Sequence, residues 1–331
     1  MARRANDSTI RLSMIVPCFN EEDVLPQTHQ RLLKTLDSDD TIESEIIYVD
    51  DGSSDATADI LNGFADADDR IVVVSLTRNF GHQAAITAGL QIASGDAIAV
   101  IDADLQDPPE LILEMMAHWR SGYDVVYGVR SQRDGGLAKR AAYNLYYRFL
   151  RSMVSFDVPL DSGDFALMDR KAVDALNALP ERNRYVRGLR AWIGLRQIGI
   201  SYRRPVRAAG MSKYTFLNLI RLGLDGVVSM SSKPLSIIFA LGVVSSIVSA
   251  ACFMFYLLWW LSDIEIFGHS PRSVPGFISV ILLLFLLGGI QLISIGVIGE
   301  YVGRIYDETK NRPTYLISYV RGTQKRSDIT R

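Results

Sequence analysis

The chain has 331 residues, a length that allows about two domains, and 48% of them are hydrophobic. Its formal net charge of −2 gives no sign of a nucleic-acid partner, so we expect none. Residues 1–9 form a polar tail with no apolar segment behind it, which argues against a cleaved signal peptide.

Strands and helices alternate through the first part of the sequence. Apolar strands are predicted, in chain order, at residues 12–16, 45–49, 71–76, 97–101 and 124–128. Helices are predicted between them at residues 23–36, from about 56, at 83–93 and from about 110. This alternation predicts an α/β domain with a mainly parallel sheet over residues 10–213. Ligands of such sheets bind at the carboxyl ends of the strands, where this sequence places its polar clusters.

The first polar cluster, residues 17–22, follows the strand at 12–16. Phe19 is suited to lie against a nucleobase, and Asn20 or Glu21 to hydrogen-bond the base edge or the ribose. Taken alone, the cluster also fits an ordinary strand-to-helix turn with a capping residue.

The second polar cluster ends the strand at 45–49 with Asp50 and Asp51. A carboxylate here can accept a hydrogen bond from the N–H of a pyrimidine ring or from a ribose hydroxyl, and Gly52 permits the turn. An ordinary capped turn is again the alternative.

The strand at 97–101 delivers two carboxylates, Asp102 and Asp104, at its carboxyl end. A bend there can turn both toward one divalent cation, with Gln106 as a further oxygen ligand. Because Mg²⁺ binds few protein carboxylates and fills its other positions with water and substrate phosphates, the pattern predicts a bound nucleoside diphosphate. The alternative is that the two acids only cap and solvate a strand end.

Two uncharged stretches near the end of the sequence, residues 234–261 and 273–299, each exceed the roughly 20 residues that a helix needs to cross a bilayer. We expect transmembrane helices at 233–261 and 274–299, joined by a short extracytoplasmic loop at 262–273. A buried helical hairpin is the alternative.

The basic residues predict the orientation of these helices. They gather before the first stretch and after the second, at Arg203, Arg204, Arg207, Lys213, Arg221, Lys233, Arg304, Lys310 and Arg312. The positive-inside rule then predicts a multi-pass protein of the cytoplasmic (inner) membrane, with both termini, the α/β domain and residues 300–331 in the cytoplasm. Cys18 falls in the cytoplasmic part and Cys252 in a span, so no disulfide is expected between them.

The polar clusters together resemble family 2 glycosyltransferases. The motifs that carry the resemblance are residues 17–22 (PCFNEE), 49–55 (VDDGSSD), 76–85 (LTRNFGHQAA) and 102–110 (DADLQDPPE). Within that family the chain is similar to polyprenyl-phosphate glycosyltransferases, the group with dolichol-phosphate mannosyltransferases and bacterial undecaprenyl-phosphate glucosyltransferases. Residues 210–214 (GMSKY), 232–235 (SKPL) and 298–306 (IGEYVGRIY) extend the resemblance over nearly the whole chain.

The resemblance implies a GT-A fold (Rossmann-like, mainly parallel sheet), a nucleotide-sugar donor, Mg²⁺ or Mn²⁺, a lipid-phosphate acceptor and a tetramer. It implies a donor site made by Pro17, Phe19, Asn20, Glu21, Asp50, Asp51, Asp102 and Lys213, and a cation site made by Asp102, Asp104 and Gln106. Lys213 would meet the donor phosphates, and Arg130 and Arg140 would hold the acceptor phosphate. A solvated basic surface is the alternative for the two arginines.

The resemblance also implies an acid facing the sugar, for which Asp164 is our candidate and Asp161 its rival. A phosphate acceptor is already largely anionic near neutral pH, so Asp164 would orient it or stabilise positive charge on the sugar rather than act as a base. With Asp104 and Lys213, Asp164 completes the expected catalytic set, for an in-line displacement that inverts the sugar. Residues 214–232 are expected to form an amphipathic juxtamembrane helix.

The resulting prediction is a hexosyltransferase that moves one sugar, glucose from UDP-glucose, to undecaprenyl phosphate. Mannose, GlcNAc-type and aminoarabinose-type donors share the scaffold and stay open. A non-catalytic nucleotide-sugar-binding membrane scaffold that recruits a lipid flippase is an alternative of another class, and a processive synthase is a third. The four histidines show no metal-ligand spacing, and His82 reads as a helix-start residue.

Overall fold

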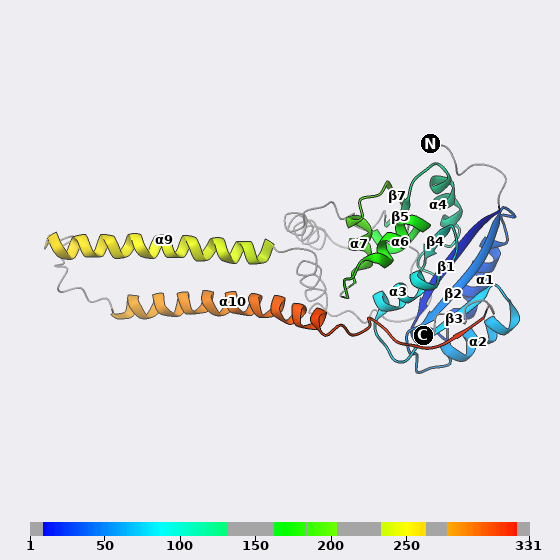
Figure 1. Cartoon of the computed structure of the whole chain (residues 1–331), viewed down its shortest axis with the longest axis horizontal. Helices are drawn as coiled ribbons and strands as arrows, with labels where there is room; N and C mark the ends of the chain where they lie inside the picture. Colours follow the sequence, from blue (N-terminus) through cyan, green and yellow to red (C-terminus); the bar gives the residue numbers. More distant parts are fainter. Residues whose placement is uncertain (1–8, 131–161, 183, 204–232, 263–276, 323–331) are drawn as a thin grey trace. The chain divides into compact units, whose positions relative to one another are not determined.

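The structure is a computed structural model that describes residues 9–130, 162–182, 184–203, 233–262 and 277–322 (Figure 1). Its contacts divide the chain into two compact units. The first unit comprises Met1–Gly223 and Arg312–Arg331, and the second comprises Leu224–Asn311. The polar clusters of the sequence therefore belong to the first unit, together with the end of the chain.

One eight-stranded sheet organises the first unit, in the order β7-β5-β6-β4-β1-β2-β3-β8. Its strands are β1 (Ile10–Cys18), β2 (Ile42–Asp50), β3 (Ile71–Leu76), β4 (Ala97–Val100), β5 (Val125–Arg130), β6 (Ser162–Asp169), β7 (Gln197–Tyr202) and β8 (Ile317–Arg321). The four central strands β4, β1, β2 and β3 are parallel, and β5 and β7 are also parallel to each other. Strands β6 and β8 run antiparallel to their neighbours. The carboxyl ends of the parallel strands thus meet the amino end of β6 along one edge.

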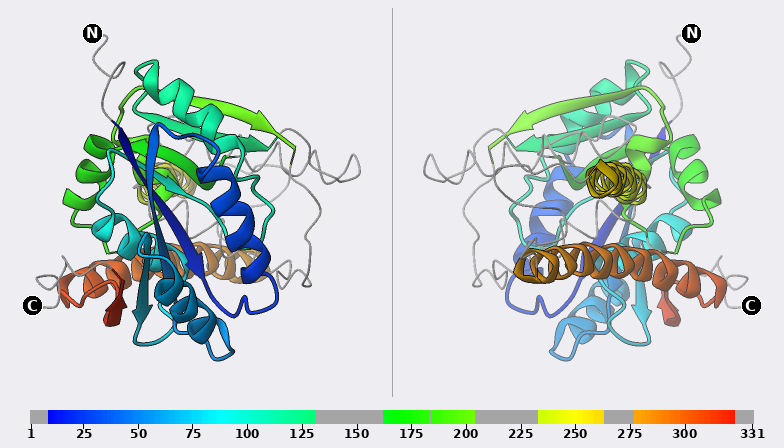
Figure 2. Two further views of the ribbon diagram at one scale, coloured as in Figure 1. Left: turned by 90° about the vertical axis from the view of Figure 1, so that its right-hand side faces the viewer. Right: turned by 90° about the vertical axis from the view of Figure 1, so that its left-hand side faces the viewer.

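Helices cover both faces of this sheet. Helices α1 (Leu25–Leu36), α2 (Thr57–Ala67) and α4 (Leu111–Arg120) pack on one face, and α3 (His82–Ile92), α6 (Arg170–Ala178) and α7 (Val186–Trp192) pack on the other. In both views of Figure 2, α1 (blue) and α3 (cyan) lie on opposite sides of β1. Because neighbouring strand residues point to opposite faces, Met14 of β1 enters the first core and Ile15 enters the second.

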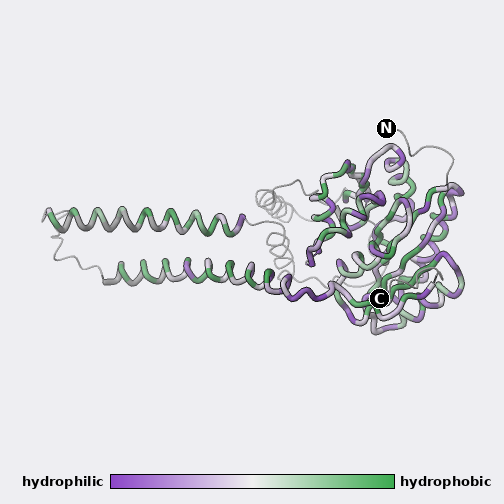
Figure 3. The backbone as a smooth tube through the Cα atoms, viewed as in Figure 1, coloured by the Kyte–Doolittle hydropathy of each residue, from purple (hydrophilic) through white to green (hydrophobic). Residues whose placement is uncertain are grey.

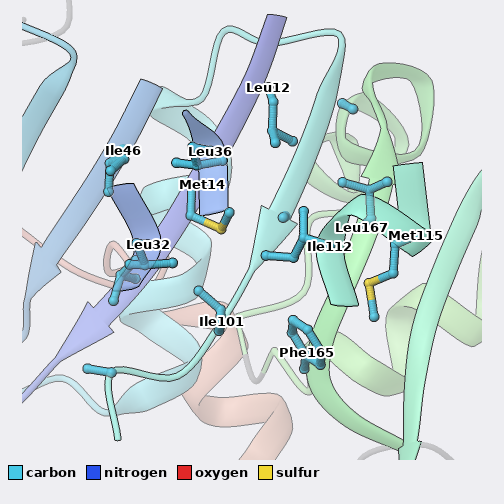
Figure 4. Packing of buried hydrophobic residues seen from close by; sticks show 14 of the residues in the cluster. Leu12, Met14, Leu32, Leu36, Ile46, Ile101, Ile112, Met115, Phe165 and Leu167 are labelled. Atoms are coloured by element: carbon cyan, nitrogen blue, oxygen red, sulfur yellow. The ribbon is translucent and has the colours of Figure 1, made fainter. Parts of the chain in front are cut away.

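The larger core brings apolar side chains from distant parts of the sequence together. Figure 4 shows Met14 and Ile101 beside Ile112 of α4 and Phe165 of β6. All of these side chains are almost fully buried. Burial on both faces explains why β3 and β4 are almost entirely apolar, and it holds the polar loops at the carboxyl ends of the strands in fixed positions.

The structure confirms the predicted alternation and the mainly parallel sheet. All five predicted strands are present, with ends that differ by no more than a few residues, and so are the four predicted helices. Three strands, β6, β7 and β8, were not predicted. Strand β6 runs antiparallel between β4 and β5, and β8 comes from the end of the chain and closes the edge beside β3.

The second unit contains helices α9 (Lys233–Ser262) and α10 (Phe277–Thr309). In Figure 3 the last turns of α10 are coloured as hydrophilic, where Glu300 and Arg304 form an ion pair at 3.0 Å. The predicted amphipathic segment 214–232 and nearly all of the predicted loop 262–273 lie outside the described residues.

The prediction of two transmembrane helices is wrong for the chain as the structure describes it. Among the described residues, no helix is both long and apolar enough to cross a membrane. The prediction relied on the length and composition of the apolar runs at residues 234–261 and 273–299. The same runs led to the predicted multi-pass location in the cytoplasmic membrane, with its cytoplasmic and extracytoplasmic parts. That prediction is wrong on the same finding.

Candidate functional site

The loop after β1 is locked to the loop after β2. Asn20 has a φ of 54°, its N–H donates to Ser53 Oγ at 3.1 Å, and its Oδ1 accepts from the N–H of Ser54 at 2.8 Å. The N–H of Glu21 donates to Thr57 Oγ1 at 2.9 Å. With the loop held in this way, Phe19 is 42% exposed at the carboxyl end of β1.

Asp50 and Asp51 are buried, and each carboxylate holds a different part of the edge. Asp50 accepts hydrogen bonds from the N–H of Ser53 at 3.0 Å and from Ser75 Oγ at 3.1 Å. Asp51 accepts from the N–H groups of Phe80 and Gly81, at 2.7 and 2.9 Å. Burial raises the pKa of Asp51 despite these two hydrogen bonds. The second cluster therefore fixes the loop that follows β3.

That loop also depends on the absence of a side chain at residue 52. Gly52 has a φ of 68°, and a Cβ there would lie 2.4 Å from the carbonyl carbon of Arg78. The guanidinium of Arg78 lies 4.1 Å from the centre of the Phe80 ring. The two loops are thus in direct backbone contact, which requires glycine at this turn.

Asp102 and Asp104 follow β4, as the sequence predicted. The Oδ1 atom of Asp102 is buried and has no hydrogen-bond partner, whereas Asp104 Oδ1 accepts from the N–H of Gln106 at 3.1 Å. Burial raises the pKa of Asp102 to about 6; the charge of His82 opposes this rise, and the nearby carboxylates of Asp107, Asp164 and Asp104 add to it. A buried carboxylate oxygen without a donor, among other carboxylates, is the environment that a divalent cation would relieve.

The donor set fits Mg²⁺ or Mn²⁺. Both cations take oxygen ligands, and Mg²⁺ takes only one or two carboxylates because it keeps water and substrate phosphates. Within the described part of the chain, no three His, Cys, Asp or Glu side chains form a ready-made metal cluster. Asp102, Asp104 and Gln106 are the residues that would hold such a cation.

His82, the first residue of α3, lies between two acids. Its Nε2 is 3.5 Å from Asp102 Oδ1 and 3.5 Å from Asp164 Oδ2. Burial by itself would lower the pKa of His82, but the hydrogen bond to Asp164 and the charges of both acids outweigh it and raise the pKa. His82 is a helix-start residue, as expected, and it also connects the predicted cation site with the predicted acid.

Asp164 lies on β6 with only 5% of its side chain exposed. Its Oδ2 accepts from Gln83 Nε2 at 3.0 Å and from Arg187 Nη2 at 3.0 Å, and its Oδ1 accepts from Arg187 Nε at 3.3 Å. Burial would raise the pKa of Asp164, but His82 and Arg187 hold it well below its ordinary value. Asp164 is therefore a fully ionised acid at the sheet edge.

Arg130 ends β5 close to Asp164. A Cβ on Gly163 would lie 3.0 Å from Arg130 Nη2, so the guanidinium passes over the backbone next to Asp164. Its Nε is buried and has no hydrogen-bond partner. Lys213, Arg140 and Asp161, which the sequence also predicted as site residues, lie outside the described residues.

Sequence reasoning did not identify four polar residues of this edge, namely Gln83, Asp107, Arg187 and Tyr202. Gln83 and Asp107 stand inside the family motifs at 76–85 and 102–110, so their positions gave a usable signal. Arg187 and Tyr202 come from α7 and the end of β7, which lie outside those motifs. Only the packing of distant elements reveals them.

The comparisons with known proteins identify the family of this chain. Residues 13–176 match the model of the family described as glycosyl transferase family 2. The chain is 43% identical over 319 residues to YkcC, an uncharacterized glycosyltransferase of Bacillus subtilis, and the match covers 96% of each chain. It is 39% identical over 309 residues to the SfII prophage-derived bactoprenol glucosyl transferase of Shigella flexneri, covering 93% of this chain and 97% of that one.

Solved structures of lower identity are also similar. The mannosyltransferase PcManGT of Pyrobaculum calidifontis, in complex with GDP-Man and Mn²⁺, is 16% identical, with a TM-score of 0.44 and coverage of 88% of this chain and 87% of that one. The mainly parallel sheet fits the GT-A fold. On the strength of sequence relatives that match over nearly their whole length, the chain belongs to glycosyl transferase family 2 and is a glycosyltransferase.

Proposed function

We propose that this enzyme transfers a single sugar, glucose from UDP-glucose, to polyprenyl phosphate, with inversion at the anomeric carbon. The observation that carries the proposal is the position of His82, whose Nε2 lies 3.5 Å from both Asp102 and Asp164. The imidazole of His82 thus lies between Asp102, an acid of the candidate cation site, and Asp164, the acid expected to face the sugar. The name of the Shigella relative, a bactoprenol glucosyl transferase, supports the acceptor and the sugar.

The donor would bind along the edge formed by the loops after β1, β2 and β4. The exposed ring of Phe19 offers a stacking surface for a base, and the Glu21 and Asp51 carboxylates lie in the adjoining turns. Asp102, Asp104 and Gln106 would hold Mg²⁺ or Mn²⁺, which would offset the negative charge of the diphosphate leaving group. Lys213 is proposed to meet the same phosphates.

The acceptor supplies its own nucleophile. A phosphate monoester carries most of its charge near neutral pH, so one of its oxygens can form the bond to the anomeric carbon without a general base. The bond from that carbon to the diphosphate oxygen breaks at the same time, and the nucleoside diphosphate leaves with the electron pair. Attack from the face opposite the leaving group inverts the configuration.

In this mechanism Asp164 keeps a fixed negative charge near the sugar. Its pKa is held low by His82 and Arg187, so it remains a carboxylate and can stabilise positive charge on the anomeric carbon. Arg130 and Arg140 are proposed to bind the acceptor phosphate through charge-assisted hydrogen bonds. The acceptor phosphate would then attack the anomeric carbon from the side opposite the departing diphosphate.

The test offers the purified protein a panel of labelled UDP and GDP sugars with undecaprenyl phosphate in detergent, with Mg²⁺ or Mn²⁺ present. We expect a lipid of the mass of undecaprenyl-phosphoglucose, with release of UDP only when acceptor and cation are both present. Asp102→Asn and Asp104→Asn should abolish product, whereas Asp59→Asn, an exposed acid of α2, should not.

Each contrary outcome has a distinct meaning. Another sugar on the lipid would correct the donor, and products of many lengths would indicate a processive synthase. No lipid product with any donor would overturn the proposed acceptor. Unchanged synthesis after thorough chelation would overturn the role of the cation.

A further inference from the structure

Arg130 and Tyr202 are paired residues at the ends of neighbouring parallel strands. In the register between β5 and β7, Arg130 lies opposite Tyr202, the last residue of its strand. Paired residues of parallel strands direct their side chains to the same face, so the guanidinium and the phenol meet there. The Arg130 guanidinium is close enough to the Tyr202 hydroxyl to oppose the rise in the pKa of Tyr202.

The same hydroxyl also reaches the loop that carries the candidate cation ligands. The Tyr202 hydroxyl donates a short hydrogen bond to Asp107 Oδ1, and Asp107 is 1% exposed. Asp107 follows Gln106 directly, in the loop that begins with Asp102. Burial and the charge of Asp107 raise the pKa of Tyr202, so the hydroxyl keeps its proton and stays a donor to the carboxylate.

The surrounding core is shaped for the ring of Tyr202. The ring packs edge-on against Phe165, with 5.8 Å between the ring centres and 76° between their planes. Gly128 of β5 leaves the space for it, because a Cβ there would lie 2.7 Å from Tyr202 Cε1 and 2.9 Å from Phe165 Cδ1. The ring is therefore held in one position, and with it the hydroxyl between Arg130 and Asp107.

We propose that Tyr202 is a positioning residue that ties Arg130, at the acceptor side of the site, to the cation-ligand loop through Asp107. The inference rests on the proposed function, in which Arg130 binds the acceptor phosphate and the loop binds the cation with the donor diphosphate. In-line attack requires these two parts to keep a fixed separation, and misplacement of either reactant lowers the rate steeply. Tyr202 and Asp107 fix that separation without touching a substrate themselves.

The test is Tyr202→Phe, which keeps the ring packing and removes only the hydroxyl. We expect faster backbone hydrogen exchange in the metal-free protein over both residues 103–110 and residues 126–130. In assays, the KM for undecaprenyl phosphate and the Mn²⁺ concentration for half-maximal rate should each rise about tenfold, the size expected for losing hydrogen bonds to charged partners. Simple destabilisation would instead lower kcat without moving these two constants together.

A matched control is Tyr48→Phe. Tyr48 is also a buried tyrosine at the sheet, with its hydroxyl 2.9 Å from His29 Nδ1, and it lies outside the site. This variant should leave the exchange of both segments, the acceptor KM and the Mn²⁺ requirement unchanged. A second readout is Arg130→Lys, in whose background Tyr202→Phe should add little to the acceptor KM because the link is already broken.

Several results would overturn the inference. Unchanged exchange in both segments would show that the hydroxyl anchors neither. A change at one segment only, or in only one of the two kinetic constants, would show that Tyr202 serves one side of the site and does not join the two. If the wild-type protein makes no glycolipid, the proposed function fails, and hydrogen exchange still decides whether Tyr202 connects Arg130 with the loop.

Discussion

Arg187 and Asp164 form a two-point ion pair, in which Nη2 and Nε of the guanidinium donate to the two carboxylate oxygens at 3.0 and 3.3 Å. Asp164 is almost fully buried, whereas Arg187 keeps 32% of its side chain exposed. A carboxylate removed from water stays charged only where such donors replace the lost hydration. The pair therefore explains how Asp164 can stay ionised although it is buried at the candidate site.

We predict that Arg187→Met lowers the stability of the protein most at neutral pH, and that mild acid relieves part of this loss. The low folded-state pKa of Asp164 contributes stability that is present above its unfolded pKa, about 3.9, and is lost as pH falls through the folded pKa. Removing Arg187 leaves burial to raise the folded pKa of Asp164, so the variant carries a poorly compensated buried charge at neutral pH, and protonation in mild acid neutralises it. The free energy of unfolding should fall by about 3–5 kcal/mol at pH 7, as for other broken buried pairs. Urea unfolding between pH 4 and pH 8 measures both effects.

The control for this prediction is Arg31→Met. Arg31 makes a slightly shorter ion pair with Glu110, at 2.8 Å, but both side chains are exposed, by 37% and 55%. Surface pairs of this kind contribute about 0–1 kcal/mol, so this variant should resemble the wild type at every pH. Equal losses in the two variants would show that the burial of Asp164 has no special effect.

We predict that Gln83→Leu lowers kcat about tenfold and also destabilises the protein. The Gln83 amide donates to Asp164 Oδ2 and accepts from the N–H of Val186 at 2.8 Å, so it links α3, β6 and the start of α7. Leucine has a similar size but leaves a buried N–H without a partner, which costs about 1–3 kcal/mol. Steady-state kinetics at saturating substrates and urea unfolding measure the two losses. A stability loss with unchanged kcat would assign Gln83 a purely structural role.

The positions of the site loops could be predicted from sequence, because local signals mark them. Apolar runs such as Ile71–Leu76 end at polar, glycine-containing segments, and parallel strands bring such ends together. The contacts inside the site could not be predicted in this way. Asp50 and Asp51 are equivalent in the sequence, yet the first holds its own turn and the second holds the loop at Phe80.

Long-range partners were missed for a similar reason. Nothing in the local sequence around Arg187 points to Asp164, and β6 was not predicted because Ser162–Asp169 mixes polar residues with a short apolar run. Strand β8 pairs with β3, although about 240 residues separate them, and no local pattern encodes that pairing.

We predict that Gly52→Ala and Gly63→Ala have opposite effects. The Cβ of the first variant would meet the carbonyl carbon of Arg78 at 2.4 Å and would need a φ of 68°, so we expect a loss of about 1–3 kcal/mol and a higher KM for the donor. Gly63 lies inside α2 with nothing within 4 Å of its added Cβ, so alanine should stabilise the helix by about 0.5–1 kcal/mol. Thermal unfolding and donor kinetics check both values. A neutral Gly52→Ala would contradict the close contact between the two loops.

The final prediction concerns the last strand of the sheet, β8. The Leu316 carbonyl accepts from the N–H of Thr77 at 2.9 Å, and Ile317 pairs with Leu76. Both contacts come just before the loop that leads from β3 to His82, the first residue of α3. Ile317 is half-buried and packs against the core, whereas Leu316 is 52% exposed. We expect Ile317→Ala to cost about 1–3 kcal/mol and Leu316→Ala less than about 0.5 kcal/mol. Because β8 supports one side of that loop and Asp51 holds the other, Ile317→Ala should also raise the donor KM, measured beside urea unfolding of both variants. An unchanged donor KM would mean that Asp51 alone keeps the loop in place.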